Sequence, residues 1–98
     1  TLLIPKEHSQ DITRMNPKLG NKMLELIQKI GNAQVKGLHA DGFNIAVNTG
    51  SDAGQKIFHT HIHLLPRFKD DGKKLWKEHE VSEEDRVLYA EKIINNME

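Results

Sequence analysis

The chain has 98 residues, enough for one domain with a modest hydrophobic core, and 37% hydrophobic and 29% charged residues are typical of a folded globular protein. Fourteen lysine and arginine residues balance fourteen aspartate and glutamate residues, which argues against a broad surface for nucleic acid or acidic membranes. Cysteine is absent, which excludes disulfides and thiolate metal sites. We therefore expect a single cytoplasmic domain over residues 1–98 that binds neither nucleic acid nor membranes.

The first half of the chain predicts a short strand, a polar loop and a helix. A strand is expected over Leu2–Lys6, limited by Pro5, which cannot donate to a strand ladder. After a polar segment, Asn16 and Pro17 form a helix start, and Gly31 is a plausible C-terminal cap for a helix over Pro17–Ile30. The apolar stripe that should pack on a sheet consists of Leu19, Met23, Leu26, Ile27 and Ile30.

The middle of the chain predicts an antiparallel hairpin. After a turn over Gly37–Gly42, alternation predicts a strand over Phe43–Asn48, with Phe43, Ile45 and Val47 on one face. The glycine-bearing loop Thr49–Gln55 then leads to a second strand over Lys56–Leu65. This arrangement should place Asn48 near one end of the second strand's polar face.

A second helix is expected near the C-terminus. Ser82 and the acidic residues that follow it are typical of a helix N-terminus. Its apolar side would comprise Val87, Leu88, Ala90, Ile93, Ile94 and Met97. His39 and His79 are expected to be solvated, and Trp76 to pack against apolar surface. The predicted fold is α+β: an antiparallel sheet of three or more strands with an amphipathic helix packed on it.

The second predicted strand carries histidine at alternate positions. A strand turns successive side chains to opposite faces, so His59, His61 and His63 would share one face. Imidazole titrates near neutral pH and can act as base, acid, nucleophile or metal ligand. We therefore predict the activity on this face. The opposite, core-facing side would comprise Phe58, Thr60, Ile62 and Leu64.

Two kinds of chemistry suit such a face. On a strand, His59 and His63 lie about 13 Å apart, so three histidines cannot easily surround one metal ion, and no carboxylate lies between Ala53 and Phe68. A metal-dependent site on His59 and His61 stays an alternative that a chelator would test. Phosphate chemistry fits better, because imidazole can attack phosphorus and form a covalent phosphoramidate. The central histidine, His61, suits that role.

The run from His59 to Leu65 resembles the signature of the histidine-triad (HIT) family, His-φ-His-φ-His-φ-φ, where φ is apolar. Thr60 is the one loose match. The resemblance extends upstream through Gly42–Phe58 and to Leu2–His8, so residues 1–68 compare with the family almost continuously.

The resemblance implies a nucleotide hydrolase or nucleotidyl transferase that acts on nucleoside phosphoramidates or dinucleoside polyphosphates. His61 would be the nucleophile that attacks the α-phosphorus through Nε2, while the backbone carbonyl of His59 holds the other ring nitrogen as N–H. His63 would hydrogen-bond a non-bridging phosphate oxygen, and His59 would help to protonate the leaving group. The family also implies a homodimer and a purine nucleotide or nucleotide conjugate as ligand.

Asn48, Gly54 and Gln55 match family positions that contact the phosphate or the leaving group. Two amides could donate to phosphoryl oxygens, and a glycine lets the backbone approach a ligand. Lys56 stands where the phosphoramidase branch often has serine, and Leu65-Pro66-Arg67 is more similar to the dinucleoside-polyphosphate hydrolase branch. For Arg67 itself we favour a surface role over phosphate contact.

No cofactor is expected. Some family members bind structural zinc through a Cys-x-x-Cys and two histidines that match His8 and His59, but this chain lacks the cysteines. We also expect the chain to lack the family's leading segment, which supplies part of the base pocket and an acidic residue for the ribose. That expectation leaves a second hypothesis open, a nucleotide-binding or interaction module without useful catalysis.

Overall fold

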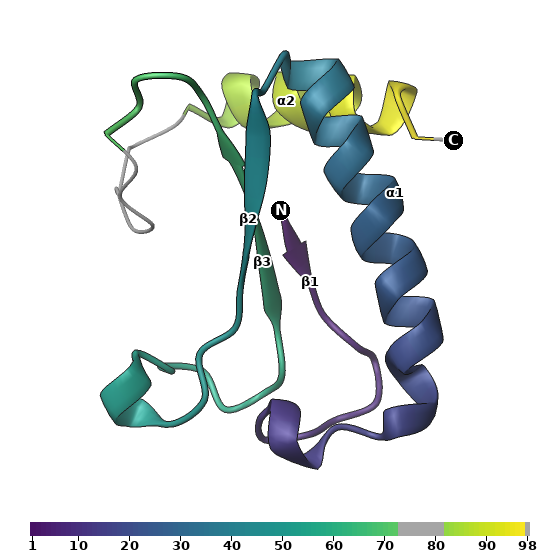
Figure 1. The fold of residues 1–98 in the computed structure, drawn as a ribbon, viewed down its shortest axis with the longest axis vertical. Coiled ribbons are helices and arrows are strands. Elements are labelled where there is room, and N and C mark those ends of the chain that lie inside the picture. The colour runs from purple at the N-terminus through teal and green to yellow at the C-terminus, as the bar shows by residue number, and fades with distance from the viewer. Residues whose placement is uncertain (73–81, 98) are drawn as a thin grey trace.

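The computed structural model describes residues 1–72 and 82–97, and the predictions for Trp76 and His79 lie outside them. Three strands and two α-helices are present in these ranges (Figure 1). In chain order they are β1 (Leu2–Leu3), α1 (Gly20–Leu38), β2 (Gly42–Ala46), β3 (Ile62–Arg67) and α2 (Glu83–Asn95). Short 3₁₀ helices cover Ile12–Arg14, Pro17–Leu19 and Ser51–Ala53.

The strands form one antiparallel sheet in the order β1-β3-β2, and α1 runs alongside it (Figure 1). Ile62 and Leu64 on the central strand are buried against Met23 of α1, which makes the core. The predicted α+β fold and the β2–β3 hairpin are therefore confirmed. Ile45 pairs with Leu64 and shares its face, but it is 53% exposed because β2 is an edge strand.

The first helix is longer than predicted. Asn16 caps the short 3₁₀ helix Pro17–Leu19 that leads into it, with Oδ1 accepting from the backbone N–H of Lys18 at 3.0 Å, and α1 itself begins at Gly20 rather than at the predicted Pro17. The predicted end at Gly31 is wrong, because α1 continues to Leu38 and shortens the turn before β2. Gly31 serves packing instead: a Cβ added there would overlap the ring of Phe43 on β2. The glycine lets the helix and the sheet approach closely.

The strands are shifted from the predicted ranges. β1 is only two residues long, β2 ends at Ala46, and β3 begins at Ile62 rather than Lys56. The predicted core position of Phe58 is also wrong, since its side chain is 46% exposed. The reason is that the residues before Ile62 bond to an N-terminal segment instead of to β2.

That N-terminal segment comprises residues 8–10, which we call the strap. The backbone N–H of Thr60 donates to the carbonyl of Ser9 at 2.8 Å, and the two hydroxyls lie 2.6 Å apart. The next strap residue, Gln10, is bonded too: its carbonyl accepts from Nε2 of Gln55 at 2.7 Å. Thr60 is 1% exposed, so the one polar residue among the apolar motif positions is buried with its hydroxyl satisfied.

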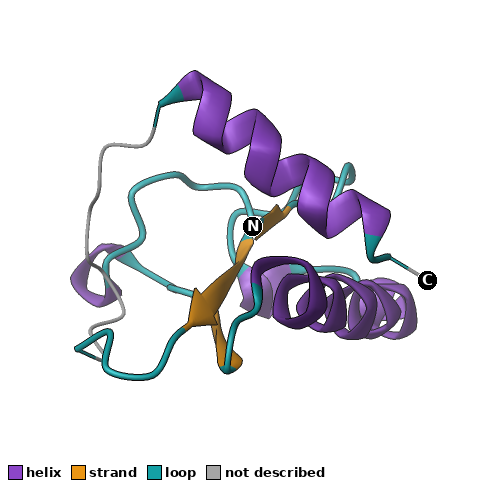
Figure 2. Cartoon of the chain, turned by 90° about the horizontal axis from the view of Figure 1, so that it is seen from above, coloured by secondary structure: helices purple, strands orange, loops and turns teal. Residues whose placement is uncertain are grey.

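The second helix begins where predicted. Ser82 Oγ accepts from the backbone N–H of Asp85 at 3.1 Å. The helix lies across one end of the sheet, with its C-terminal end beside α1 (Figures 1 and 2). A Cβ at Gly37 of α1 would overlap the carbonyl of Lys92, so this contact is also close. Much of the expected apolar side remains exposed, including Val87, Leu88 and Ile94. Within the described ranges, neither helix is long and apolar enough to cross a membrane.

We predict that Gly31→Ala lowers the free energy of unfolding by about 1–3 kcal/mol, because the methyl group must displace the Phe43 ring. Gly20→Ala, at the start of the same helix with open space around it, is the matched control and should change stability by less than about 1 kcal/mol. Urea unfolding of the two variants measures the difference. Equal effects would contradict the packing role of Gly31.

Thr60→Val should cost about 1–3 kcal/mol, because it leaves the buried hydroxyl of Ser9 without its partner. The double variant with Ser9→Ala removes both hydroxyls and should lose less than the sum of the two single changes. Urea unfolding of the four proteins in this cycle tests the strap. Strict additivity would show that the two hydroxyls do not interact.

Candidate active site

His61 and His63 lie together at the start of β3. Their ring centroids are 5.0 Å apart and the rings meet edge to face at 71°. His63 belongs to β3, where the neighbouring Ile62 and Leu64 face the core, so alternation turns His63 to the opposite face of the sheet. His61 precedes the strand by one residue. The structure therefore brings two of the three predicted imidazoles together.

A backbone hydrogen bond sets the protonation of His61. Its Nδ1 lies 2.7 Å from the carbonyl oxygen of His59. A carbonyl oxygen only accepts, so Nδ1 carries the proton. In the neutral ring, Nε2 is then left with a lone pair. This is the bond that the family resemblance implied, and a lone pair on Nε2 is what a nucleophilic imidazole requires.

The environment of His63 favours its neutral form. Burial lowers the pKa of His63 below its ordinary value of 6.5, and the nearby His61 and the amino terminus lower it further. A neutral His63 at neutral pH has one N–H to donate and one lone pair to accept. It can therefore hydrogen-bond a phosphoryl oxygen without carrying a full charge.

The ring of His59 is engaged elsewhere. Its Nδ1 lies 2.8 Å from Nδ1 of His8, and its Nε2 lies 2.8 Å from the carbonyl of Pro5. His59 precedes β3, so the expectation that three histidines share one face of a single strand is wrong for this residue. The structure joins His59 to His61 through the backbone carbonyl.

Gln55 holds the loop before the histidines. The side chain is 4% exposed, and its Nε2 donates to the carbonyls of Gln10 at 2.7 Å and Ile57 at 3.1 Å. Its Oε1 accepts from the backbone N–H of Gly50 at 2.8 Å. Both amide hydrogens are therefore used within the protein. In this arrangement Gln55 shapes the loop and has no free N–H for a phosphate.

Asn48 lies against the same loop. Its Nδ2 is 3.5 Å from the carbonyl of Gly54, a long contact that leaves the amide easily redirected. Gly50 and Gly54 have φ angles of 88° and 94°, which glycine adopts without strain. A Cβ at Gly54 would come within 3.2 Å of the Asn48 amide. The loop thus brings the backbone of Gly54, which has no side chain, close to Asn48.

Arg67 is paired at the far end of β3. Its Nε and Nη2 bond the two carboxylate oxygens of Asp71 at 2.9 and 2.7 Å. This bidentate ion pair stabilises the charged form and raises the pKa of Arg67. The structure therefore gives Arg67 a role in holding residues 67–71 together.

The residues suggested as zinc ligands do not make a metal site. In the part of the chain that is described, no three His, Cys, Asp or Glu side chains are grouped to hold an ion. His8 and His59 supply only two imidazoles, and their nearest nitrogens bond each other directly. Structural zinc usually needs four protein ligands, so this donor set does not fit.

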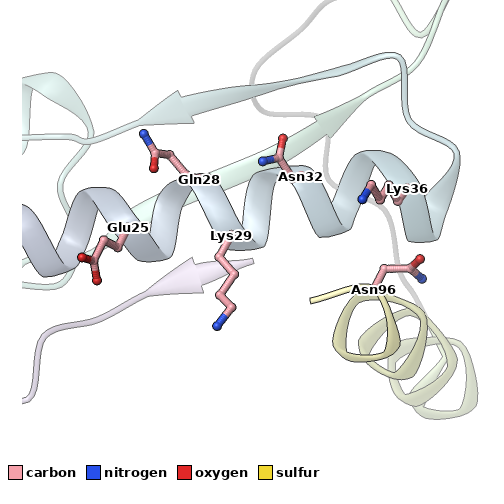
Figure 3. A pocket seen from close by; sticks show the side chains of 6 residues that line it. All are labelled: Glu25, Gln28, Lys29, Asn32, Lys36 and Asn96. Atoms are coloured by element: carbon pink, nitrogen blue, oxygen red, sulfur yellow. The ribbon is translucent and has the colours of Figure 1, made fainter. Parts of the chain in front are cut away.

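A hollow on the outer side of α1 contains none of the predicted site residues (Figure 3). Its lining is polar and almost entirely exposed, without a buried group that could select a ligand. The lining residues are Glu25, Gln28, Lys29, Asn32, Lys36 and Asn96.

Comparison with known proteins gives consistent matches. A HIT-like protein of Borreliella burgdorferi is 45% identical over 74 residues, which cover 74% of this chain and 53% of that protein. The adenylylsulfatase HINT3 of Arabidopsis thaliana is 44% identical over 71 residues, covering 72% of this chain and 36% of that protein. The chain thus spans about half or less of the length of these relatives.

Solved structures of HIT-like proteins are also similar to this chain. A HIT-like protein involved in cell-cycle regulation from Bartonella henselae has a TM-score of 0.87 at 26% identity, covering 98% of this chain and 69% of that one. A histidine triad nucleotide-binding protein from Sulfolobus tokodaii has a TM-score of 0.76 at 26% identity, covering 96% and 68%. The family model of the HIT domain matches residues 1–70. Because this model covers more than half of the chain, the chain belongs to the HIT family.

Proposed function

We propose that the protein is a nucleotide-binding hydrolase or nucleotidyl transferase that cleaves at the α-phosphate of nucleoside phosphoramidates or dinucleoside polyphosphates. The observation that carries this proposal is the bond from His61 Nδ1 to the His59 carbonyl, which leaves Nε2 of His61 as a nucleophile. The similarity to an adenylylsulfatase and to a nucleotide-binding protein supports the substrate class.

The reaction would run in two displacements. The Nε2 lone pair of His61 attacks the α-phosphorus, the bond to the leaving group breaks, and a nucleotidyl-His61 forms. Water then attacks the same phosphorus, the P–N bond breaks, and its electrons return to Nε2. The water's proton goes to solvent. Neutral His63, 5.0 Å from His61 between ring centroids, would donate its N–H to a non-bridging oxygen as negative charge grows there.

The leaving group needs a proton in the first displacement. His59 is the residue we predict to supply it, and its Nε2–H now donates to the carbonyl of Pro5. Delivery from His59 therefore requires that this bond open when substrate binds and that the ring first take a second proton from solvent at Nδ1, so that an imidazolium donates and a neutral imidazole remains. The proton that the attacking water later releases to solvent balances the one taken up. Asn48 and Gly54 would contact the phosphate, while Gln55 would act by holding their loop in place.

A second candidate is a nucleotide-binding or interaction module without useful catalysis. It is favoured by one observation: both ring nitrogens of His59 are engaged within the protein. This candidate predicts that AMP binds without any turnover of its conjugates.

The nucleophile is tested by incubating the protein with adenosine 5′-phosphoramidate and with a diadenosine polyphosphate in the presence of chelator. We expect AMP release and, after acid quench, an adenylylated peptide that contains His61. His61→Ala should lower turnover by at least about a thousandfold while the protein stays folded. His39→Asn, at an exposed histidine after α1, is the matched control and should keep full activity.

Activity retained in His61→Ala would contradict the covalent mechanism. Absence of both turnover and adduct in folded wild-type protein would favour the binding module. Loss of turnover on adding chelator would instead support the metal-dependent alternative on His59 and His61.

We further propose that the protein forms a homodimer. The edge strand β2 exposes Ile45, and α2 exposes Val87, Leu88 and Ile94, so apolar side chains and an open sheet edge are both available for pairing. Size-exclusion chromatography with light scattering should give twice the mass of one chain. A monomer at all concentrations would contradict this proposal.

A further inference from the structure

We propose that His8 is a positioning residue for the nucleophile: it holds the ring of His59 so that the His59 carbonyl stays on Nδ1 of His61. The catalytic consequence rests on the proposed function, whereas the hydrogen-bond arrangement itself does not. His8 lies 51 residues before His59 in sequence and reaches it through the strap.

The directions of the hydrogen bonds follow from the Pro5 carbonyl. That oxygen only accepts, so Nε2 of His59 carries a proton and donates at 2.8 Å. In neutral His59 the other nitrogen, Nδ1, then has a lone pair. The donor to that lone pair is Nδ1–H of His8, at 2.8 Å. Each imidazole is therefore held in one tautomer, and His59 is fixed at both ring nitrogens.

The structure also explains how His8 is presented. The side chain of His8 is exposed, but its neighbour Ser9 is buried and bonded to Thr60 through backbone and hydroxyl. The rings of His8 and His59 are in contact, with centroids 4.9 Å apart at a tilt of 54°. The strap thus places one exposed imidazole against the side chain whose backbone sets the tautomer of His61.

Removal of His8 would leave the ring of His59 held only by Pro5. The peptide that follows His59 would still be tied to the strap through the N–H of Thr60 on the Ser9 carbonyl. Rotation of the released His59 side chain would nevertheless let the carbonyl of that peptide tilt away from His61 Nδ1 part of the time. Without that acceptor, His61 can place its proton on Nε2. In that tautomer the attacking nitrogen has no lone pair, so kcat should fall while substrate binding changes little.

The test uses His8→Ala and His8→Asn in the full chain, with chelator present, at a pH of about 8, which is above the ordinary pKa of an imidazole. The Asn amide can replace the N–H that His8 Nδ1 donates, and Ala cannot. The first measurement is the ¹⁵N spectrum of the His61 ring, which distinguishes the two neutral tautomers without any substrate. The second is kcat and KM for adenosine 5′-phosphoramidate, with His39→Asn as control.

We expect His8→Ala to raise the fraction of His61 protonated at Nε2 and to lower kcat by about three- to tenfold, which is the size expected for one exposed hydrogen bond. KM should stay nearly constant, and His8→Asn should recover both the tautomer and most of kcat. Stability changes alone would not produce this pattern of rescue.

An unchanged His61 tautomer in His8→Ala would overturn the proposal, as would equal losses of kcat in the Ala and Asn variants. If wild-type protein releases no AMP, the proposed function fails, and the ¹⁵N spectra of the same variants still decide whether His8 positions His61.

Discussion

The hydrogen bonds between the strap, residues 8–10, and residues 55–60 are the constraint on which the site depends. They draw the histidine segment away from β2, so that β3 begins only at Ile62. Because Thr60 is bonded to Ser9, the backbone on either side of it is fixed, and the His59 carbonyl meets the ring of His61. The three polar residues of the strap thus position the imidazole of His61.

This arrangement separates the three histidines by role. The rings of His61 and His63 lie side by side at the start of β3, and burial lowers the pKa of His63. The ring of His59 hydrogen-bonds His8 and Pro5, and its backbone carbonyl accepts a hydrogen bond from Nδ1 of His61. In the proposed reaction, a phosphate would meet a lone pair on His61 and an N–H donor on His63.

Helix caps, the hairpin and buried strand positions could be predicted from the sequence, because local patterns decide them. The caps at Asn16, before the 3₁₀ turn that leads into α1, and at Ser82, before α2, depend on side chains that bond their own neighbouring backbone, and both are confirmed. The hairpin and the buried alternation of Thr60, Ile62 and Leu64 also follow from local periodicity. The HIT family was recognisable because its motif is local.

The features that only the tertiary structure decided depend on contacts between residues that are distant in sequence. Gly31 suggests a helix end locally, yet it lies inside α1 because Phe43 of a later strand packs on it. Period-two patterning placed His59 on the strand, but its ring turns to His8, 51 residues away, because the strap offers bonds that the sheet does not. The sequence by itself determined which side chains could do the chemistry; long-range hydrogen bonds and close packing decided where each of them points, because such contacts leave no periodic trace in the chain.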